Sequence, residues 1–222
     1  MDMIPKDNIM CIGCIVMTAG QSKRFIGGNK LLEKIQGREL IRYTLDKVKD
    51  VQSKLAKASA AIELMPLVVT CWDEIAKICE ELSIDCLQYE GGLQSETIRR
   101  GLQYAKSWKW AGCMFMTGDQ PLTGVNSLIR LMRAFEKDNS SVYRLCWGNK
   151  PGNPTIFPAR YFTELMKLTG DQGGKSLLKT HEIPVTHVSV EHSWELLDVD
   201  TRQDLETVQR IIVDEDHSGW KK

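Results

Sequence analysis

The stretch IMCIGCIVM at residues 9–17, followed by TAGQSKRFIGGNK at residues 18–30, decides the fold. Its first part is a continuous run of apolar and small residues, which is typical of a strand buried on both faces of a sheet. The run has about half of the ~20 residues that a membrane helix needs. Asp2 and Asp7 also dilute any basic region before it, so we expect no signal peptide and no membrane partner.

Strands and amphipathic helices alternate after this first strand. We expect further strands at residues 67–71, 84–89, 111–116, 141–146, 154–157, 183–190 and 194–199. Helices are expected after Gly37, over residues 75–82, from residue 95, and at residues 125–135, 161–168, 174–179 and 201–213. This alternation predicts an α/β protein with a mostly parallel sheet between two helical layers, a three-layer α/β/α Rossmann-like fold. We expect a single domain over residues 1–222, with its core at about 9–213 and a flexible C-terminal tail.

The charges of the chain cancel, with 29 Lys and Arg residues against 29 Asp and Glu residues and a pI near 6.9. This balance argues against nucleic acid as a partner, because a nucleic-acid binder shows a basic excess. The seven cysteines are scattered through apolar runs, which is typical of free thiols in a reducing compartment, and we expect a cytoplasmic protein. Cys11 and Cys14 have the spacing of a redox or metal pair, but on a strand they point to opposite faces.

Ligands of such sheets bind outside the carboxyl ends of the strands, so the loops that follow strands are the informative ones. The first of them combines three glycines with three cations, namely Gly20, Gly27, Gly28, Lys23, Arg24 and Lys30. Exposed N–H groups and basic side chains of this kind bind phosphate oxygens. The loop fits neither the Walker pattern nor the Gly-x-Gly-x-x-Gly pattern of dinucleotide folds. Taken alone, it is equally well read as a surface loop with solvated basic residues.

Carboxylates stand at two later strand ends. Asp119 lies in the segment GDQP at residues 118–121, and Asp198 and Asp200 lie in DVDT at residues 198–201, where they alternate onto one face of the expected last strand. Two such carboxylates suit Mg²⁺, which prefers oxygen ligands and keeps waters and substrate phosphates in its shell. The alternative for Asp119 is a helix cap, and the pair Thr201 and Asp204 looks like a helix N-terminus. Whether Asp198 or Asp200 is the second ligand stays open.

Six segments together resemble one family. They are AGQSKR at 19–24, GGNKLL at 27–32, GDQPL at 118–122, GNP at 152–154, LTGDQGGKSLL at 168–178 and DVDT at 198–201. In this order they resemble nucleotidyltransferases with a Rossmann-like core, and most closely the molybdenum cofactor cytidylyltransferases. The segment GGLQSETI at 91–98 is more similar to the cytidylyltransferases of isoprenoid synthesis. Thr18, Ile26 and Lys175 depart from the family's usual Ala, Gly and Arg, but none of these changes removes a group that the chemistry needs.

The resemblance implies transfer of a nucleotidyl group from CTP to a phosphate-bearing acceptor such as molybdopterin, with Mg²⁺ as cofactor and a molybdenum hydroxylase as a partner protein. It implies catalytic roles for Arg24, Lys30 and Asp119, with Asp119 and Asp200 as metal ligands. The implied nucleotide contacts are Thr18, Ala19, Gly20, Gln21, Ser22, Lys23, Ser95, Thr97 and Gly118. The implied acceptor contacts are Gly152, Asn153, Pro154, Asp171, Gly173, Gly174 and Lys175.

Three other functions stay open at this point. The first is a GTP-dependent guanylyltransferase, although the resemblance implies that Ala19 and Gly20 in place of two glycines favour CTP. A cytidylyltransferase for a sugar or polyol phosphate is the second alternative. A non-catalytic maturation factor that binds the molybdenum cofactor is the third, but such a carrier need not keep Arg24, Lys30 and both aspartates.

Overall fold

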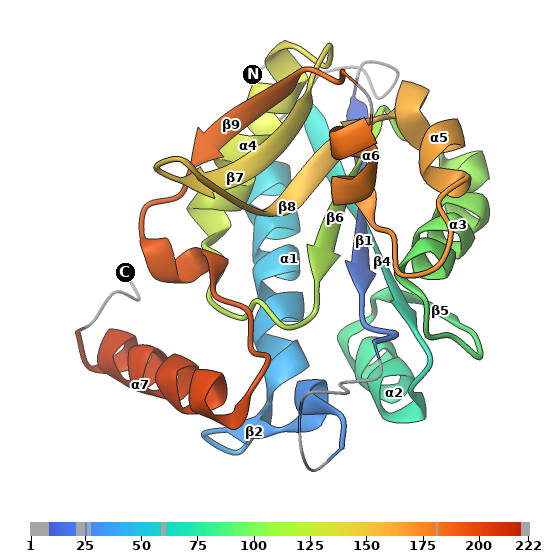
Figure 1. The fold of residues 1–222 in the computed structure, drawn as a ribbon. Helices are drawn as coiled ribbons and strands as arrows, with labels where there is room; N and C mark the ends of the chain where they lie inside the picture. Colours follow the sequence, from blue (N-terminus) through green and yellow to red (C-terminus); the bar gives the residue numbers. More distant parts are fainter. Residues whose placement is uncertain (1–8, 21–24, 26–27, 59–60, 181, 219–222) are drawn as a thin grey trace.

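The computed structural model describes residues 9–20, 25, 28–58, 61–180 and 182–218 (Figure 1). Its main sheet has seven strands in the order β5-β4-β1-β6-β8-β7-β9. These strands are β1 (Met10–Met17), β4 (Ile62–Thr70), β5 (Asp85–Gln88), β6 (Gly112–Thr117), β7 (Val142–Trp147), β8 (Lys150–Pro158) and β9 (Val185–Ser189). All neighbours pair in parallel except at β8, which is antiparallel to both β6 and β7. The predicted α/β class with a mostly parallel sheet is confirmed.

Helices cover both faces of this sheet. On one face lie α1 (Leu40–Lys57), α2 (Asp73–Leu82), α4 (Val125–Lys137) and α7 (Arg202–Ser218), whose apolar side chains join one hydrophobic core. On the other lie α3 (Gln94–Tyr104), α5 (Phe162–Met166) and α6 (Gly174–Thr180), which close a second core (Figure 1). The short hairpin of β2 (Lys34–Ile35) and β3 (Arg38–Glu39) precedes α1, and the 3-10 turns are η2 (Lys30–Leu32), η3 (Ala105–Trp108), η4 (Ala159–Tyr161) and η5 (Ser193–Leu196).

The central strand β1 contributes side chains to both hydrophobic cores, as its continuous apolar sequence predicts. Cys14 and Val16 point into the first core, whereas Ile15 points into the second and Cys11 packs against it. Cys11 and Cys14 therefore lie on opposite faces, as predicted for residues three apart on a strand. Gly13 has no side chain because Trp110 fills the space: a Cβ there would lie 2.1 Å from Cε3 of that indole.

The predicted strand at residues 194–199 is wrong, because η5 occupies its first half. The buried carboxylate of Glu195 accepts hydrogen bonds from the backbone N–H groups of Gly124, Glu191 and His192, at 2.7, 2.8 and 3.1 Å. These bonds fold the chain into a turn and tie it to the start of α4. Asp198 and Asp200 thus follow a turn and do not share the face of a strand.

Other expected boundaries move without changing the architecture. β4 begins at Ile62 rather than at residue 67, β8 begins at Lys150 rather than at residue 154, and α7 continues to Ser218. Residues 219–222 of the expected tail lie outside the described residues. Within the described part of the chain, no helix has both the length and the apolar character needed to cross a bilayer.

Candidate active site

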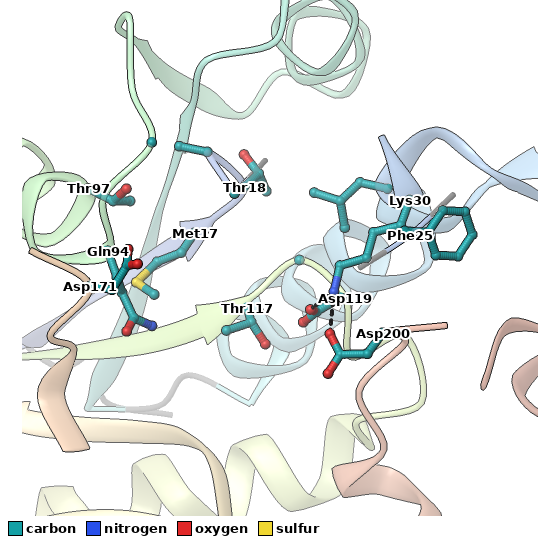
Figure 2. A pocket seen from close by; sticks show the side chains of 15 residues that line it. Met17, Thr18, Phe25, Lys30, Gln94, Thr97, Thr117, Asp119, Asp171 and Asp200 are labelled. Carbon is teal, nitrogen blue, oxygen red and sulfur yellow. Dashed lines mark hydrogen bonds and ion pairs between the residues drawn. The ribbon is translucent and has the colours of Figure 1, made fainter. Parts of the chain in front are cut away.

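A cavity of about 400 Å³ opens at the carboxyl ends of β1 and β6 (Figure 2). Nine of the residues predicted for the site line it, namely Thr18, Ala19, Gly20, Lys30, Thr97, Gly118, Asp119, Asp171 and Asp200. The predicted residues Gln21, Ser22, Lys23 and Arg24 lie outside the described residues. The structure therefore brings together, at one edge of the sheet, side chains from opposite ends of the sequence.

Lys30 stands between the two aspartates that the sequence singles out. Its Nζ lies 2.6 Å from Oδ2 of Asp119 and 2.9 Å from Oδ1 of Asp200 (Figure 2). The preceding Asn29 positions the lysine, because its Oδ1 accepts a hydrogen bond from the N–H of Leu31 and so caps η2. Burial disfavours the ammonium, but the two carboxylates outweigh that effect and raise the pKa of Lys30 above its ordinary value.

Asp119 keeps one carboxylate oxygen unused by the described residues. Its Oδ1 is buried and has no hydrogen-bond partner among them. Asp119 does not cap a helix, because α4 begins only at Val125 and has Gly124 as its N-cap. The Asp119 carbonyl accepts a hydrogen bond from the N–H of Val199 at 3.0 Å, which brings the segment carrying Asp200 beside it.

The alternative of local capping holds for Asp204. Its Oδ2 accepts hydrogen bonds from the N–H groups of Thr201 and Asp200, at 2.8 and 3.1 Å. The Thr201 hydroxyl in turn lies 3.2 Å from the N–H of Asp204, so the two residues form the predicted helix start. Because Asp204 caps this helix, the carboxylate of Asp200 can pair with the Lys30 ammonium.

Asp198 faces a different space. It lines a second cavity beyond Thr117 and Gln120, where partial desolvation and then the charges of Asp119 and Asp200 raise its pKa to about 6. Asp119 and Asp200 supply carboxylate oxygens of the kind that a divalent cation requires, among them Oδ1 of Asp119, which has no hydrogen-bond partner among the described residues. Among the described residues, no three His, Cys, Asp or Glu side chains form a ready-made metal cage. This donor set therefore fits an ion that completes its shell with water and phosphate, as Mg²⁺ does.

The loops around this centre leave little room for side chains. A Cβ on Gly118 would lie 2.8 Å from Cγ2 of Thr18 and 2.9 Å from Cδ1 of Ile41. The Thr18 hydroxyl donates to the carbonyl of Val69 at 3.0 Å, which fixes the chain as it leaves β1. At Gly20, by contrast, a Cβ would meet no atom of the described residues within 4 Å.

Ser95 and Thr97 have different positions. Thr97 lines the first cavity, and its Oγ1 lies 2.7 Å from the hydroxyl of Tyr89. Ser95 lines neither cavity, because it is buried and its Oγ donates to the carbonyl of Gly170 at 2.7 Å. Ser95 therefore holds the loop before α6.

Most of the predicted acceptor contacts line the second cavity, which measures about 310 Å³. They are Gly152, Asn153, Gly173, Gly174 and Lys175. Asp171 lines the first cavity instead, and Pro154, which follows a cis peptide bond, lines neither. Met17, Gln94 and Thr117 line both cavities, so the two spaces adjoin.

Sequence reasoning missed several residues that line the two cavities, among them Phe25, Gln94 and Arg144. Phe25 is buried against the first cavity, with the Arg202 guanidinium 5.0 Å from its ring centroid. Gln94 lies in the wall between the cavities, next to the glycines at 91–92 that pointed to this segment. Arg144 lines the second cavity from the middle of β7, where no motif marks it.

Comparison with solved structures finds the same fold in several proteins. Rv0371c from Mycobacterium tuberculosis superimposes with a TM-score of 0.72 at 22% identity, over 91% of this chain and 98% of that one, and has also been solved with manganese. A nucleotidyl transferase from Methanothermobacter thermautotrophicus gives 0.74 at 19% identity, over 91% and 98% of the two chains. Molybdopterin-guanine dinucleotide biosynthesis protein A from Archaeoglobus fulgidus gives 0.67 at 17% identity, over 92% and 100%. At these identities the likeness shows the fold alone. Comparison with curated proteins gives no match.

The fold and the site together define a Rossmann-like α/β enzyme that acts on nucleotides. Residues 14–185, more than half of the chain, match the family described as the MobA-like NTP transferase domain. The chain belongs to this family and is a nucleotidyltransferase, which confirms the resemblance to enzymes of molybdenum cofactor assembly.

Proposed function

We propose that the chain transfers a CMP group from CTP to the phosphate of molybdopterin and releases pyrophosphate. The observation that supports this most is the cluster of Lys30, Asp119 and Asp200, which lines the same cavity as Thr18, Ala19 and Gly20. An oxygen of the acceptor phosphate forms a bond to the α-phosphorus of CTP as the bond to pyrophosphate breaks. The reaction needs no covalent enzyme intermediate, because positioning and charge stabilisation supply most of the catalysis.

Each charged group has a distinct task in this proposal. The Lys30 ammonium binds the α-phosphate and stabilises the charge that develops on it. Asp119 and Asp200 hold Mg²⁺, which when bound neutralises charge on phosphate oxygens. A divalent ion as cofactor agrees with the manganese complex of Rv0371c. Thr18, Ala19 and Gly20 bind the nucleotide through the backbone, and the sequence resemblance adds Lys23 and Arg24 at the triphosphate.

The choice of CTP rests on Ala19 and Gly20 and on the cytidylyltransferase-like segment at residues 91–98. GTP is the second candidate, because the name of the Archaeoglobus relative specifies a guanine dinucleotide. Pyrophosphate release with Mg²⁺, molybdopterin and each of the four nucleoside triphosphates in turn tests the choice. Fastest release with CTP supports the proposal, and fastest release with GTP replaces it with guanylyl transfer. A second series replaces molybdopterin by a sugar or polyol phosphate, and release in that series alone changes the acceptor.

A non-catalytic maturation factor is the alternative from another class. Tight cofactor binding without turnover under any nucleotide would favour it. Against it stand the described cation and both carboxylates, which a carrier does not require. We place the reaction in the cytoplasm, where the seven free cysteines would stay reduced, and expect a molybdenum hydroxylase to receive the product.

A further inference from the structure

The second cavity contains a buried cation that the proposed reaction does not use. Arg144 is only 9% exposed, and it forms no ion pair with any described carboxylate. Its Nε and Nη2 both donate to one acceptor, the carbonyl of Gly152, at 3.2 and 2.9 Å. A buried guanidinium that lacks a counter-charge is unfavourable. Desolvation accordingly lowers the pKa of Arg144. An anionic ligand in this cavity would supply the counter-charge that the described residues do not provide.

The surroundings of Arg144 are those of a ligand site. Lys150 and Lys175 line the same cavity, while Asp198 is the one acidic residue among its described lining residues. The floor is aromatic, with Phe115 and Phe157 packed edge to face at 5.9 Å between ring centroids.

The side-chain amide of Gln120 is a second, independent indication that this cavity binds a ligand. It lines the cavity and is 2% exposed, yet its Oε1 has no hydrogen-bond partner among the described residues. A buried amide oxygen without a partner is costly in a finished protein interior. A ligand that donates a hydrogen bond there would remove this cost.

The register of the sheet separates Arg144 from the reacting centre. Arg144 pairs with Thr155 of β8, and Thr155 pairs with Phe115 of β6. Two strand spacings, roughly 9–10 Å, therefore lie between the backbone of Arg144 and the strand that leads to Asp119. An acceptor whose phosphate reaches Lys30 and Asp119 would place a more distant part of its structure against Arg144.

We propose that Arg144, assisted by Lys150 and Lys175, binds a second anionic group on the acceptor, distinct from the phosphate that attacks the nucleotide. This inference rests on the proposed function, whose acceptor carries a planar ring and a phosphate monoester, and it adds the requirement of a separate negative charge. The aromatic floor takes the ring, Gln120 accepts a hydrogen bond from it, and the cations fix its orientation.

Fluorescence titration with two probes tests this inference without turnover. Pterin-6-carboxylate carries the charge, and 6-hydroxymethylpterin is its uncharged counterpart. We expect the wild-type chain to bind the carboxylate about 10-fold more tightly, the factor that a charge-assisted hydrogen bond supplies. Arg144→Gln should remove this preference, and Arg144→Lys should restore part of it. Equal binding of both probes by the wild-type chain would overturn the proposal.

Substitution of Arg144 also removes its hydrogen bonds to the Gly152 carbonyl and can therefore disturb the structure. Two lysines of α6 provide a matched pair of variants without this complication. Lys175 lines the cavity, whereas the exposed Lys179 lies one turn further along α6 and does not. Lys175→Gln should reduce the preference for the charged probe and raise the KM for molybdopterin with little change in the KM for CTP. Lys179→Gln should change neither, and equal effects of the two variants would contradict a local anion site. Charge preference without CMP transfer would reject the proposed function but keep the anion site, and transfer without charge preference would do the reverse.

Discussion

The ammonium of Lys30 lies 2.6 Å from Oδ2 of Asp119, although 89 residues separate the two in the sequence. The same ammonium lies 2.9 Å from Asp200, near the other end of the chain. One cation therefore pairs with two carboxylates that belong to separate loops. This relationship links the stability of the site to its chemistry.

The variant Lys30→Met tests whether this lysine contributes both to stability and to catalysis. Without the ammonium, the carboxylates of Asp119 and Asp200 lose their shared counter-charge. Because these ion pairs are only partly buried, we expect the free energy of unfolding to fall by about 2 kcal/mol, between the losses typical of exposed and of buried pairs. Added Mg²⁺ or Mn²⁺ should then raise the melting temperature of the variant more than that of the wild-type chain. Its rate of pyrophosphate release should fall by about 10²–10³-fold, the loss typical for removing one group that stabilises developing charge.

Lys34→Met is the control for this variant. Lys34 is largely exposed, and its Nζ lies 3.8 Å from Glu39, so the loss should be below about 1 kcal/mol. Equal melting temperatures for the two variants, with or without metal, would argue against the shared counter-charge at Lys30.

Gly118→Ala tests the close packing behind Asp119. The new methyl group would meet Thr18 and Ile41 at under 3 Å, so we expect a loss of about 1–3 kcal/mol from overpacking. Gly20→Ala should not lower the stability in this way, because no atom of the described residues lies within 4 Å of its Cβ position. Denaturant unfolding of both variants checks the difference, and an unaltered Gly118→Ala protein would show that the space is larger than described.

Glu195→Ala tests why residues 194–199 form a turn. Three backbone N–H groups lose their acceptor, and we expect the free energy of unfolding to fall by about 3 kcal/mol. Glu191→Ala removes only an exposed ion pair with Arg130 and should cost less than about 1 kcal/mol. The measurement is chemical denaturation, and similar losses for the two variants would contradict the role of Glu195.

Asp198 predicts a pH dependence of stability in the metal-free protein. Its pKa of about 6 is above the ordinary value of 3.8, so the folded state holds this proton more tightly than the unfolded state. The stabilising contribution is complete below about pH 4 and is lost as the pH rises through 6. Asp198→Asn should therefore be more stable than wild type at pH 7.5 in EDTA, with no difference near pH 4. A difference that is constant across this range would exclude the raised pKa.

The sequence predicts the parts of this molecule that depend on local pattern. The run from residue 9 to 17 predicts β1 and its two buried faces, and Thr201 with Asp204 predicts the start of α7. The strand prediction for residues 194–199 is wrong because Glu195 accepts a hydrogen bond from the N–H of Gly124, which lies far away in the chain. Local alternation of apolar residues carries no information about such a contact.

The same limit applies to the site. Lys30, Asp119 and Asp200 were predicted because each stands in a recognisable segment at the end of a strand or before a helix. Arg144 was missed because it stands inside an apolar strand, and only the pairing of β7 with β8 places it beside Gly152. The family resemblance could not find it either, because none of the matching segments contains it.

Pyrophosphate release from CTP and molybdopterin in the presence of Mg²⁺, by the wild-type chain and by Asp119→Ala, tests the central claim most directly. We predict release by the wild-type chain and a loss of at least about 100-fold in the variant. The variant should keep its fold, because the Lys30 ammonium still pairs with Asp200. A folded Asp119→Ala enzyme with wild-type, metal-dependent release would contradict the assignment of Asp119 as a metal ligand.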